Sequence, residues 1–291
     1  MNSSNLRSPL VDRDIICIIG AGTMGSGIAQ VAAQSGFKTL LFDINTAVLN
    51  NAQSSIQKSL QSLVEKQKIN TEESNAITER LQYVNDINLC KANVFIEAII
   101  EKTEAKVDIF NQLAAINDEG VIFASNTSSL SISDIQQSVV NPSRVVGMHF
   151  FNPAPIMKLV EVVKGKQTDE AVAQNIYILC QQMNKVPVMC KDAPGFIVNR
   201  VARHYYLEAM KMVEEGVAGF ENIDAIMEAS GFKMGPFKLM DLIGMDINLA
   251  VSNSIYEAFD KEERFMPSQL QIDKVAKTEL GRKTGKGFYQ Y

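Results

Sequence analysis

The stretch IICIIGAGTMGSGIAQVAAQSGFKTLLFD, residues 15–43, decides the fold of this chain. Its apolar start, residues 15–20, predicts a buried strand. The glycine-rich segment that follows predicts a tight turn and a helix that ends at Gly36. Residues 38–43 predict a second apolar strand. A strand, turn, helix and second strand in such a short stretch are typical of a βαβ unit.

Gly20, Gly22 and Gly25 form a GxGxxG motif between the first strand and the helix. The first glycine permits the turn, the second lets backbone approach a pyrophosphate, and the third lets helix pack on strand. The N–H groups at the helix start then face the phosphates. Asp43 ends the second strand, where a carboxylate binds ribose hydroxyls and repels a ribose phosphate. The motif therefore favours NAD over NADP; the alternative is a glycine loop with a capping aspartate.

Strands and helices alternate through the rest of the first two thirds of the chain. A helical pair is predicted over 46–80 and a helix over 107–116; further strands are predicted at 94–99, 121–125, 144–150, 158–163 and 186–190. Such alternation predicts a mostly parallel sheet that is covered on both faces.

The pattern changes after residue 190, where only helical segments follow. A long helix starts near Pro194 and ends near Gly216, and two further helices follow it. We therefore expect an α/β Rossmann-type doubly wound sheet followed by an all-α C-terminal domain. The predicted domains are an NAD-binding domain over 1–190, in which 1–13 is a leader, and a helical dimerisation and substrate domain over 191–291.

Composition narrows the class of protein. The net charge of −5 disfavours a general nucleic-acid binder. The apolar runs are far shorter than the ~20 residues of a membrane span, and the N-terminus lacks the apolar core of a signal peptide, so a cytoplasmic protein without membrane contact is expected. The four cysteines, at positions 17, 90, 180 and 190, form no zinc pattern. We expect reduced thiols and no metal.

One of the two histidines, His149, ends a predicted strand at the sheet edge where open α/β sheets bind ligands. Glu161 follows in the otherwise apolar run LVEVV. A buried carboxylate needs a partner, and a carboxylate beside an imidazole stabilises the ring's charged form and fixes its tautomer. If the two strands are neighbours, Glu161 can reach His149. The alternative is a structural histidine, which is the interpretation we prefer for His204.

The segment SNTSS, residues 125–129, follows a predicted strand and so lies at the same edge of the sheet. Its hydroxyls and amide could donate to a carbonyl or a ribose, or could cap the helix that starts near Ser131. The sequence leaves these two interpretations open. Lysines at positions 58, 66 and 68 could attract an anionic substrate, although such lysines more often form a solvated helix face.

The chain resembles the L-3-hydroxyacyl-CoA dehydrogenase family, close to its stand-alone 3-hydroxybutyryl-CoA members. The resemblance rests on seven stretches spread over residues 14–291: GAGTMGSGIAQVAA, IEAIIE, ASNTSSLSI, GMHFFNPAPIMKLVEVV, KDAPGFIVNR, MGPFKLMDLIG and GRKTGKGFYQY. HFFNP, LVEVV and PGFIVNR in that order and spacing are highly specific. The leader lies outside the pattern, and residues 46–90 match it least well.

This resemblance implies the roles of particular residues. It implies that His149 is the base that removes the hydroxyl proton of a (3S)-3-hydroxyacyl thioester, that Glu161 supports it, and that Ser128 and Asn199 hold the substrate oxygens. It implies a cofactor site for NAD made of Gly20, Ala21, Gly22, Thr23, Met24, Gly25, Asp43, Glu101, Lys106, Ser128, Asn152 and Lys283. It also implies that Ser59, Lys66 and Ser128 contact the CoA substrate, and that the protein is a homodimer formed through its C-terminal domain.

Two other functions fit part of the same sequence. Related dehydrogenases of this two-domain build oxidise free hydroxy acids, and His149, Glu161 and Asn199 would serve them equally well. A non-catalytic NAD-binding protein is the other alternative, and the intact set of Ser128, His149, Glu161 and Asn199 speaks against it. The NPAPIMKLVEVV stretch favours the acyl-CoA dehydrogenase.

Overall fold

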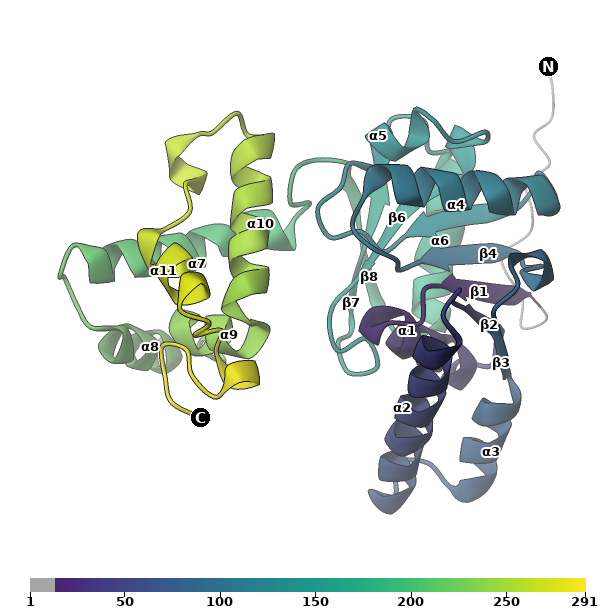
Figure 1. Cartoon of the computed structure of the whole chain (residues 1–291), viewed down its shortest axis with the longest axis horizontal. Coiled ribbons are helices and arrows are strands. Elements are labelled where there is room, and N and C mark those ends of the chain that lie inside the picture. Colours follow the sequence, from purple (N-terminus) through teal and green to yellow (C-terminus); the bar gives the residue numbers. More distant parts are fainter. Residues whose placement is uncertain (1–13) are drawn as a thin grey trace. The chain divides into compact units, whose positions relative to one another are not determined.

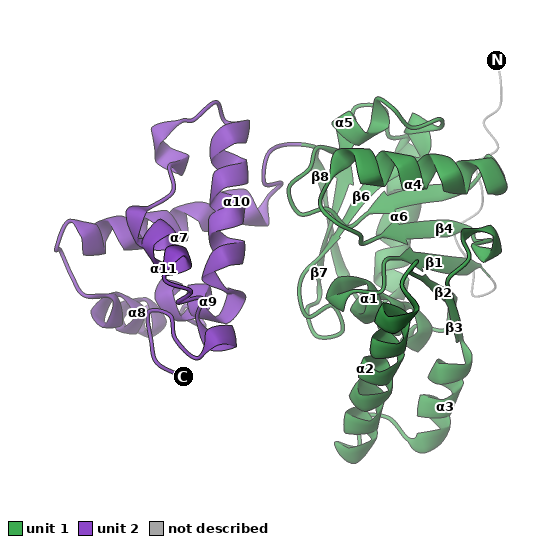
Figure 2. Ribbon diagram, in the orientation of Figure 1, with its two compact units in different colours: residues 1–192 green, residues 193–291 purple. Residues whose placement is uncertain are grey.

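The computed structural model describes residues 14–291, so the predicted leader, 1–13, lies outside the described residues. The chain forms two compact units, a first unit up to Asp192 and a second unit, Ala193–Tyr291 (Figure 2). The composition change in the sequence falls after residue 190 and the two units divide after Asp192. Each unit is built on a different plan (Figure 1).

The first unit is organised around one eight-stranded sheet in the order β3-β2-β1-β4-β5-β6-β7-β8. Its strands are β1 (Ile15–Ile19), β2 (Lys38–Phe42), β3 (Leu81–Val84), β4 (Val94–Glu97), β5 (Ile122–Ser125), β6 (Val145–Phe150), β7 (Leu159–Lys164) and β8 (Val186–Lys191). Only the β6–β7 pair is antiparallel. The doubly wound α/β fold expected from the sequence is confirmed. The strand β3, which is short and directly follows a helix, is not among the strands predicted from the sequence.

Helices cover both faces of this sheet. They are α1 (Thr23–Gln34), α2 (Thr46–Glu65), α3 (Thr71–Glu79), α4 (Thr103–Ile116), α5 (Ile132–Gln136) and α6 (Glu170–Gln182), with 3-10 turns η1 (Ile87–Leu89) and η2 (Pro142–Arg144). Side chains alternate along each strand, so Ile16 and Ile18 join the core under α1, α2 and α6. Phe95 and Phe123 face the other way and pack with Phe110 of α4.

The second unit is entirely helical, as the sequence predicts. It contains α7 (Val198–Glu214), α8 (Phe220–Ala229), α9 (Pro236–Ile243), α10 (Met245–Ala258), α11 (Gln269–Ala276), η3 (Glu263–Phe265) and η4 (Arg282–Thr284). Its core includes the fully buried Met210, Phe237 and Met240. Two isolated bridges, Gly281–Lys286 and Lys286–Gln290, are the only pairings of strand type described after residue 192.

The described part of the chain, residues 14–291, lacks two features. No helix there combines the length and the apolar character that crossing a membrane requires. No group of three or more histidine, cysteine, aspartate or glutamate side chains within those residues is arranged to hold a metal ion.

Candidate active site

The glycine loop between β1 and α1 has the geometry that its sequence predicts. Gly20 has a φ of +97°, a conformation that favours glycine. A Cβ on Gly25 would lie 1.7 Å from the Gly20 carbonyl oxygen, so α1 could not start so close to the loop with any other residue. A Cβ on Gly22 would meet nothing within 4 Å. The backbone at Gly22 therefore borders open space in which a phosphate fits.

The start of α1 and Asp43 complete this cradle. The N-cap of α1 is Gly22 and no side chain caps the helix, so the N–H groups of its first turn, which includes Thr23, Met24 and Gly25, face outward. Asp43 accepts a 2.9 Å hydrogen bond from the backbone N–H of Ala21. The carboxylate thus lies beside the loop, where it can also accept from ribose hydroxyls. These residues fit NAD, and its binding domain is the one that this fold provides.

His149 and Glu161 lie opposite each other on β6 and β7, the antiparallel pair. Their side chains are buried and in contact, with 2.7 Å between Nδ1 of His149 and Oε2 of Glu161. An ionised carboxylate only accepts, so Nδ1 carries the shared proton and Nε2 is the basic nitrogen of the ring. The ring of His149 also packs on Phe151, with 4.5 Å between centroids. The pairing register thus supplies the contact that the sequence suggested.

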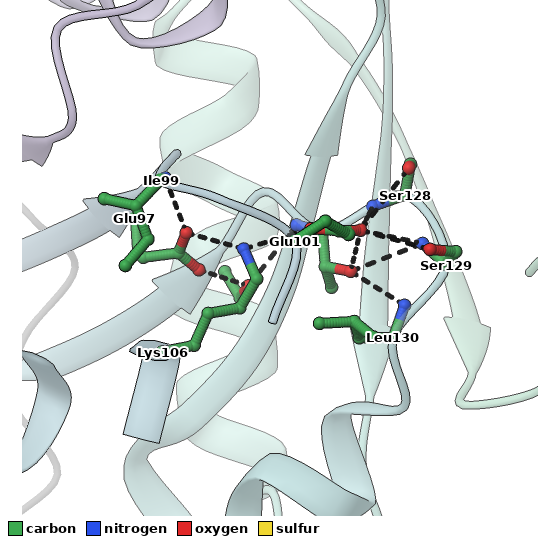
Figure 3. A network of polar contacts seen from close by, with 9 residues as sticks. Glu97, Ile99, Glu101, Lys106, Ser128, Ser129 and Leu130 are labelled. Atoms are coloured by element: carbon green, nitrogen blue, oxygen red, sulfur yellow. Dashed lines mark hydrogen bonds and ion pairs between the residues drawn. The ribbon is translucent and has the colours of Figure 1, made fainter. Parts of the chain in front are cut away.

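The loop after β5 carries Ser128 beside the end of β6. Asn126 accepts a 2.8 Å hydrogen bond from the Phe150 N–H, which fastens the loop next to the strand that carries His149. The Glu101 carboxylate accepts from the Ser128 N–H at 2.9 Å and from the Thr127 hydroxyl at 2.5 Å (Figure 3). Glu101 and Ser128, two residues that the resemblance implies in the cofactor site, are therefore in direct contact.

Lys106 lies behind Glu101 and is almost completely buried. Its ammonium group is 2.6 Å from Glu97 and 3.1 Å from Glu101. The resemblance implies Lys106 in the cofactor site, and the structure shows what holds the side chain in position: an ion pair with two carboxylates. Of these, Glu97 was missed, although a charged residue in the apolar stretch VFIEAI carried the same signal as Glu161 in LVEVV.

A cavity of about 430 Å³ opens beside the glycine loop within the first unit. Its walls come from the first turns of α1, from one side of α2 and from the turn after β6, and include Gly22, Thr23, Ser59, Asn152 and Pro153. Ser59, implied in CoA binding, and Asn152, implied in NAD binding, therefore line one space. Lys66 is exposed at the C-terminal end of α2.

Lys185 supports the turn that forms one wall of this cavity, and sequence reasoning missed it. Its buried ammonium group donates to the carbonyl oxygens of Ala154, at 2.5 Å, and Met157, at 2.9 Å. Burial lowers the pKa of Lys185 to about 8, and the positive charge of Lys158 adds to this effect. No sequence motif marks this lysine.

The other predicted residues lie in the second unit. Asn199 is in the first turn of α7, and Lys283 in η4 forms an ion pair with Asp246. His204 is exposed on α7, with its ring against Phe265. The roles of Asn199 and Lys283 stay predictions, because the geometry of the second unit alone does not test them.

Comparison with known proteins identifies relatives along almost the whole described chain. The family model for the NAD-binding domain of 3-hydroxyacyl-CoA dehydrogenase matches residues 15–193, and the model for the C-terminal domain of the same enzymes matches residues 195–291. A probable 3-hydroxybutyryl-CoA dehydrogenase of Deinococcus radiodurans is 40% identical over 276 residues, which cover 94% of this chain and 99% of the relative.

Two further matches come from Escherichia coli K12, one to a curated sequence and one to a solved structure. A 3-hydroxyadipyl-CoA dehydrogenase is 45% identical over 97% of this chain, which spans 60% of that relative's length. A crystal structure described as 3-hydroxybutyryl-CoA dehydrogenase superimposes with a TM-score of 0.93 at 45% identity, and the match covers 96% of this chain and 60% of the solved one. The likeness extends through both units.

Proposed function

Because this chain belongs to the 3-hydroxyacyl-CoA dehydrogenase family and is an NAD-dependent oxidoreductase, we propose that it interconverts short-chain (3S)-3-hydroxyacyl-CoA and 3-oxoacyl-CoA. The observation that carries this proposal is the buried pair of His149 and Glu161, whose side chains are 2.7 Å apart in the sheet that also carries the glycine loop. A secondary alcohol needs a base for its proton, and this pair is suited to accept one.

The proposed mechanism assigns one task to each side chain. Nε2 of His149 takes the proton from the substrate hydroxyl, and Glu161 stabilises the imidazolium that forms. Ser128 and Asn199 donate to the reacting oxygen. NAD⁺, held at the glycine loop and Asp43, would supply the hydride acceptor for the substrate carbon. In the reverse direction His149 returns its proton to the new alkoxide.

The cavity beside the glycine loop supports a thioester of CoA rather than a free acid. It extends along α2 as far as Ser59, and Ser55 and Asn51 add further polar groups to that wall. Val48, Ala52 and Ile56 line the same wall, which is therefore mixed in character. A small hydroxy acid would not reach so far along α2, whereas the pantetheine and nucleotide parts of CoA would. Lys66, about two helical turns beyond Ser59, then offers a positive charge to a phosphate.

We also propose that the protein is a homodimer formed through the second unit. The support is a set of large apolar side chains that are exposed in this chain alone: Val201, Ile226, Leu242, Ile247 and Ile272. Sedimentation analysis would test it, since a monomer at micromolar concentration would contradict the proposal. A cytoplasmic location rests on the sequence alone and is tested by cell fractionation.

The first experiment is NADH oxidation with acetoacetyl-CoA, run beside free acetoacetate and with NADPH in place of NADH. We expect rapid turnover only with the thioester and NADH. Turnover of free acetoacetate at a similar rate would favour a hydroxy-acid dehydrogenase. NADH binding without turnover of either compound would favour a non-catalytic NAD-binding protein.

A 3-hydroxyacyl-CoA whose chain ends in a carboxylate is a second candidate substrate. It is favoured by the name of the Escherichia coli relative, a 3-hydroxyadipyl-CoA dehydrogenase. Comparing kcat/KM for 3-hydroxyadipyl-CoA and 3-hydroxybutyryl-CoA on the same preparation separates the two substrates.

A further inference from the structure

Glu97 is a fully buried carboxylate at the end of β4 whose two oxygens are both engaged. Oε1 accepts from the Lys106 ammonium group at 2.6 Å and from the Ile99 N–H at 2.7 Å. Oε2 accepts a 2.7 Å hydrogen bond from the hydroxyl of Ser125, which is the last residue of β5. Glu97 therefore joins β4, β5 and α4 at the ligand edge of the sheet (Figure 3).

Besides Glu97, the ammonium group of Lys106 also contacts a second carboxylate, that of Glu101. Only 1% of the lysine side chain is exposed, and Oε2 of Glu101 lies 3.1 Å from its ammonium nitrogen. The other oxygen of Glu101 accepts from the Thr127 hydroxyl and from the Ser128 and Ser129 N–H groups, at 2.5, 2.9 and 3.2 Å. One buried cation thus lies between two carboxylates, and the outer carboxylate holds the loop that carries Ser128.

The charges in this cluster depend on one another. Burial raises the pKa of Glu97, and Lys106 together with the hydrogen-bond donors counteracts only part of that effect. Burial also acts to raise the pKa of Glu101, but Lys106 and the loop donors outweigh it, so the pKa of Glu101 is lowered. Removing one partner of a buried ion pair leaves the other charge uncompensated. Without the charge on Glu97, the attraction of Lys106 would fall on Glu101 alone.

We propose that Glu97 is a positioning residue, which places Ser128 by holding Lys106 so that Glu101 stays in contact with the Thr127–Ser129 loop. Neutralising Glu97 draws Glu101 toward Lys106 and releases the Ser128 and Ser129 N–H groups. The positioning of the loop is argued from the contacts of Glu97, Lys106 and Glu101 alone. The expected kinetic effect rests on the proposed function, in which Ser128 touches the substrate.

Hydrogen exchange tests the positioning of the loop without any substrate. In Glu97→Gln, we expect the amides of Ser128 and Ser129 to exchange about tenfold faster than in the unmodified protein, because their acceptor has moved. Glu104→Gln, an exposed carboxylate on the same helix as Lys106, is the matched control and should leave both amides unchanged. Faster exchange confined to residues 97–99 would show a local structural role and would overturn the proposal.

A double-mutant cycle with Ser128→Ala tests the kinetic part, provided that the unmodified enzyme turns over acetoacetyl-CoA. Glu97→Gln should lower kcat about tenfold, which corresponds to ~1.4 kcal/mol of transition-state stabilisation. In the Ser128→Ala background the same change should cost less than about twofold, since its effect passes through Ser128. Equal losses in the two backgrounds would contradict the proposal.

A variant that keeps the charges balanced covers the case in which Glu97→Gln does not fold. Glu97→Gln combined with Lys106→Met removes both buried charges together, so neither is left uncompensated by the loss of the other. With no ammonium group left to draw Glu101 away, the two loop amides should keep nearly their normal protection. Exchange about tenfold faster in this double variant would show that Lys106 does not transmit the effect and would overturn the proposal, whereas a failure of turnover in the unmodified enzyme would instead refute the proposed function.

Discussion

At the scale of single residues, the proposed chemistry rests on the pair of His149 and Glu161. Both side chains are buried, and each supplies what the other needs: an acceptor for Nδ1–H and a partner for a carboxylate that is 1% exposed. An imidazole held in one tautomer presents Nε2 as a base in a defined direction. The pair is therefore suited to take a proton from a bound alcohol and to return it.

We expect His149→Gln to reduce kcat by about 10²–10⁴, the usual contribution of a general base. NADH affinity should change little, because the glycine loop and Asp43 are untouched. Steady-state kinetics and fluorescence titration with NADH measure the two quantities. His204→Gln, at the only other histidine, is the control and should keep its activity. A His149→Gln variant with near-normal kcat would remove this residue from the mechanism.

At the scale of elements, the turn from β1 into α1 depends on a single close approach. The helix starts so near the loop that the Gly20 carbonyl occupies the place of any side chain at residue 25. The same approach directs the first turn of α1 toward the open space at Gly22. Strand, loop and helix therefore form one unit, which is suited to bind an anion.

Gly25→Ala should destabilise the first unit by about 1–3 kcal/mol, the usual cost of overpacking, and should weaken NADH binding because the loop must shift. Gly22→Ala is the matched variant for stability, since its new methyl group meets nothing within 4 Å. Thermal unfolding of the two variants gives the comparison. If both lowered the melting temperature equally, the close approach at Gly25 would not explain its glycine.

At the scale of the whole molecule, the pH dependence of the folding stability should reflect the titration of Lys185. This lysine is remote in sequence from Ala154 and Met157, whose carbonyl groups it joins to the start of β8. The pKa of Lys185 is about 8 in the folded protein, against 10.5 for a lysine that is not buried. Between these two pH values the lysine is therefore more protonated in the unfolded chain than in the folded one. Stability should therefore rise with pH from about 8 to 10.5 through this group.

Lys185→Met should remove that rise, which calorimetry of the unfolding transition between about pH 8 and 10.5 would show. Lys166→Met, at an exposed lysine, should keep it. At lower pH the variant also lacks the two hydrogen bonds to the turn at Ala154 and Met157. An identical pH dependence in Lys185→Met and the unmodified protein would show that this ammonium group titrates normally.

Much of this protein is determined by local sequence. The glycine loop, the alternating strands and helices, and the helical character of the second unit follow from spacing and apolar periodicity, which act over a few residues. The contact of His149 with Glu161 could be anticipated too, since a carboxylate within LVEVV requires a nearby partner. The order and spacing of HFFNP, LVEVV and PGFIVNR were enough to indicate the family.

Only the tertiary structure decided how distant parts meet. The antiparallel β6–β7 pair fixes the register of His149 and Glu161, and β3 joins the edge of the sheet although its sequence is too short to show a period. The sequence shows a charged Glu97 within an apolar stretch, but not that Lys106 is buried between Glu97 and Glu101. The support of one cavity wall by Lys185 leaves no sequence motif. The physical reason is that burial and ion pairing depend on which surfaces pack together, a property of the assembled sheet and not of neighbouring residues.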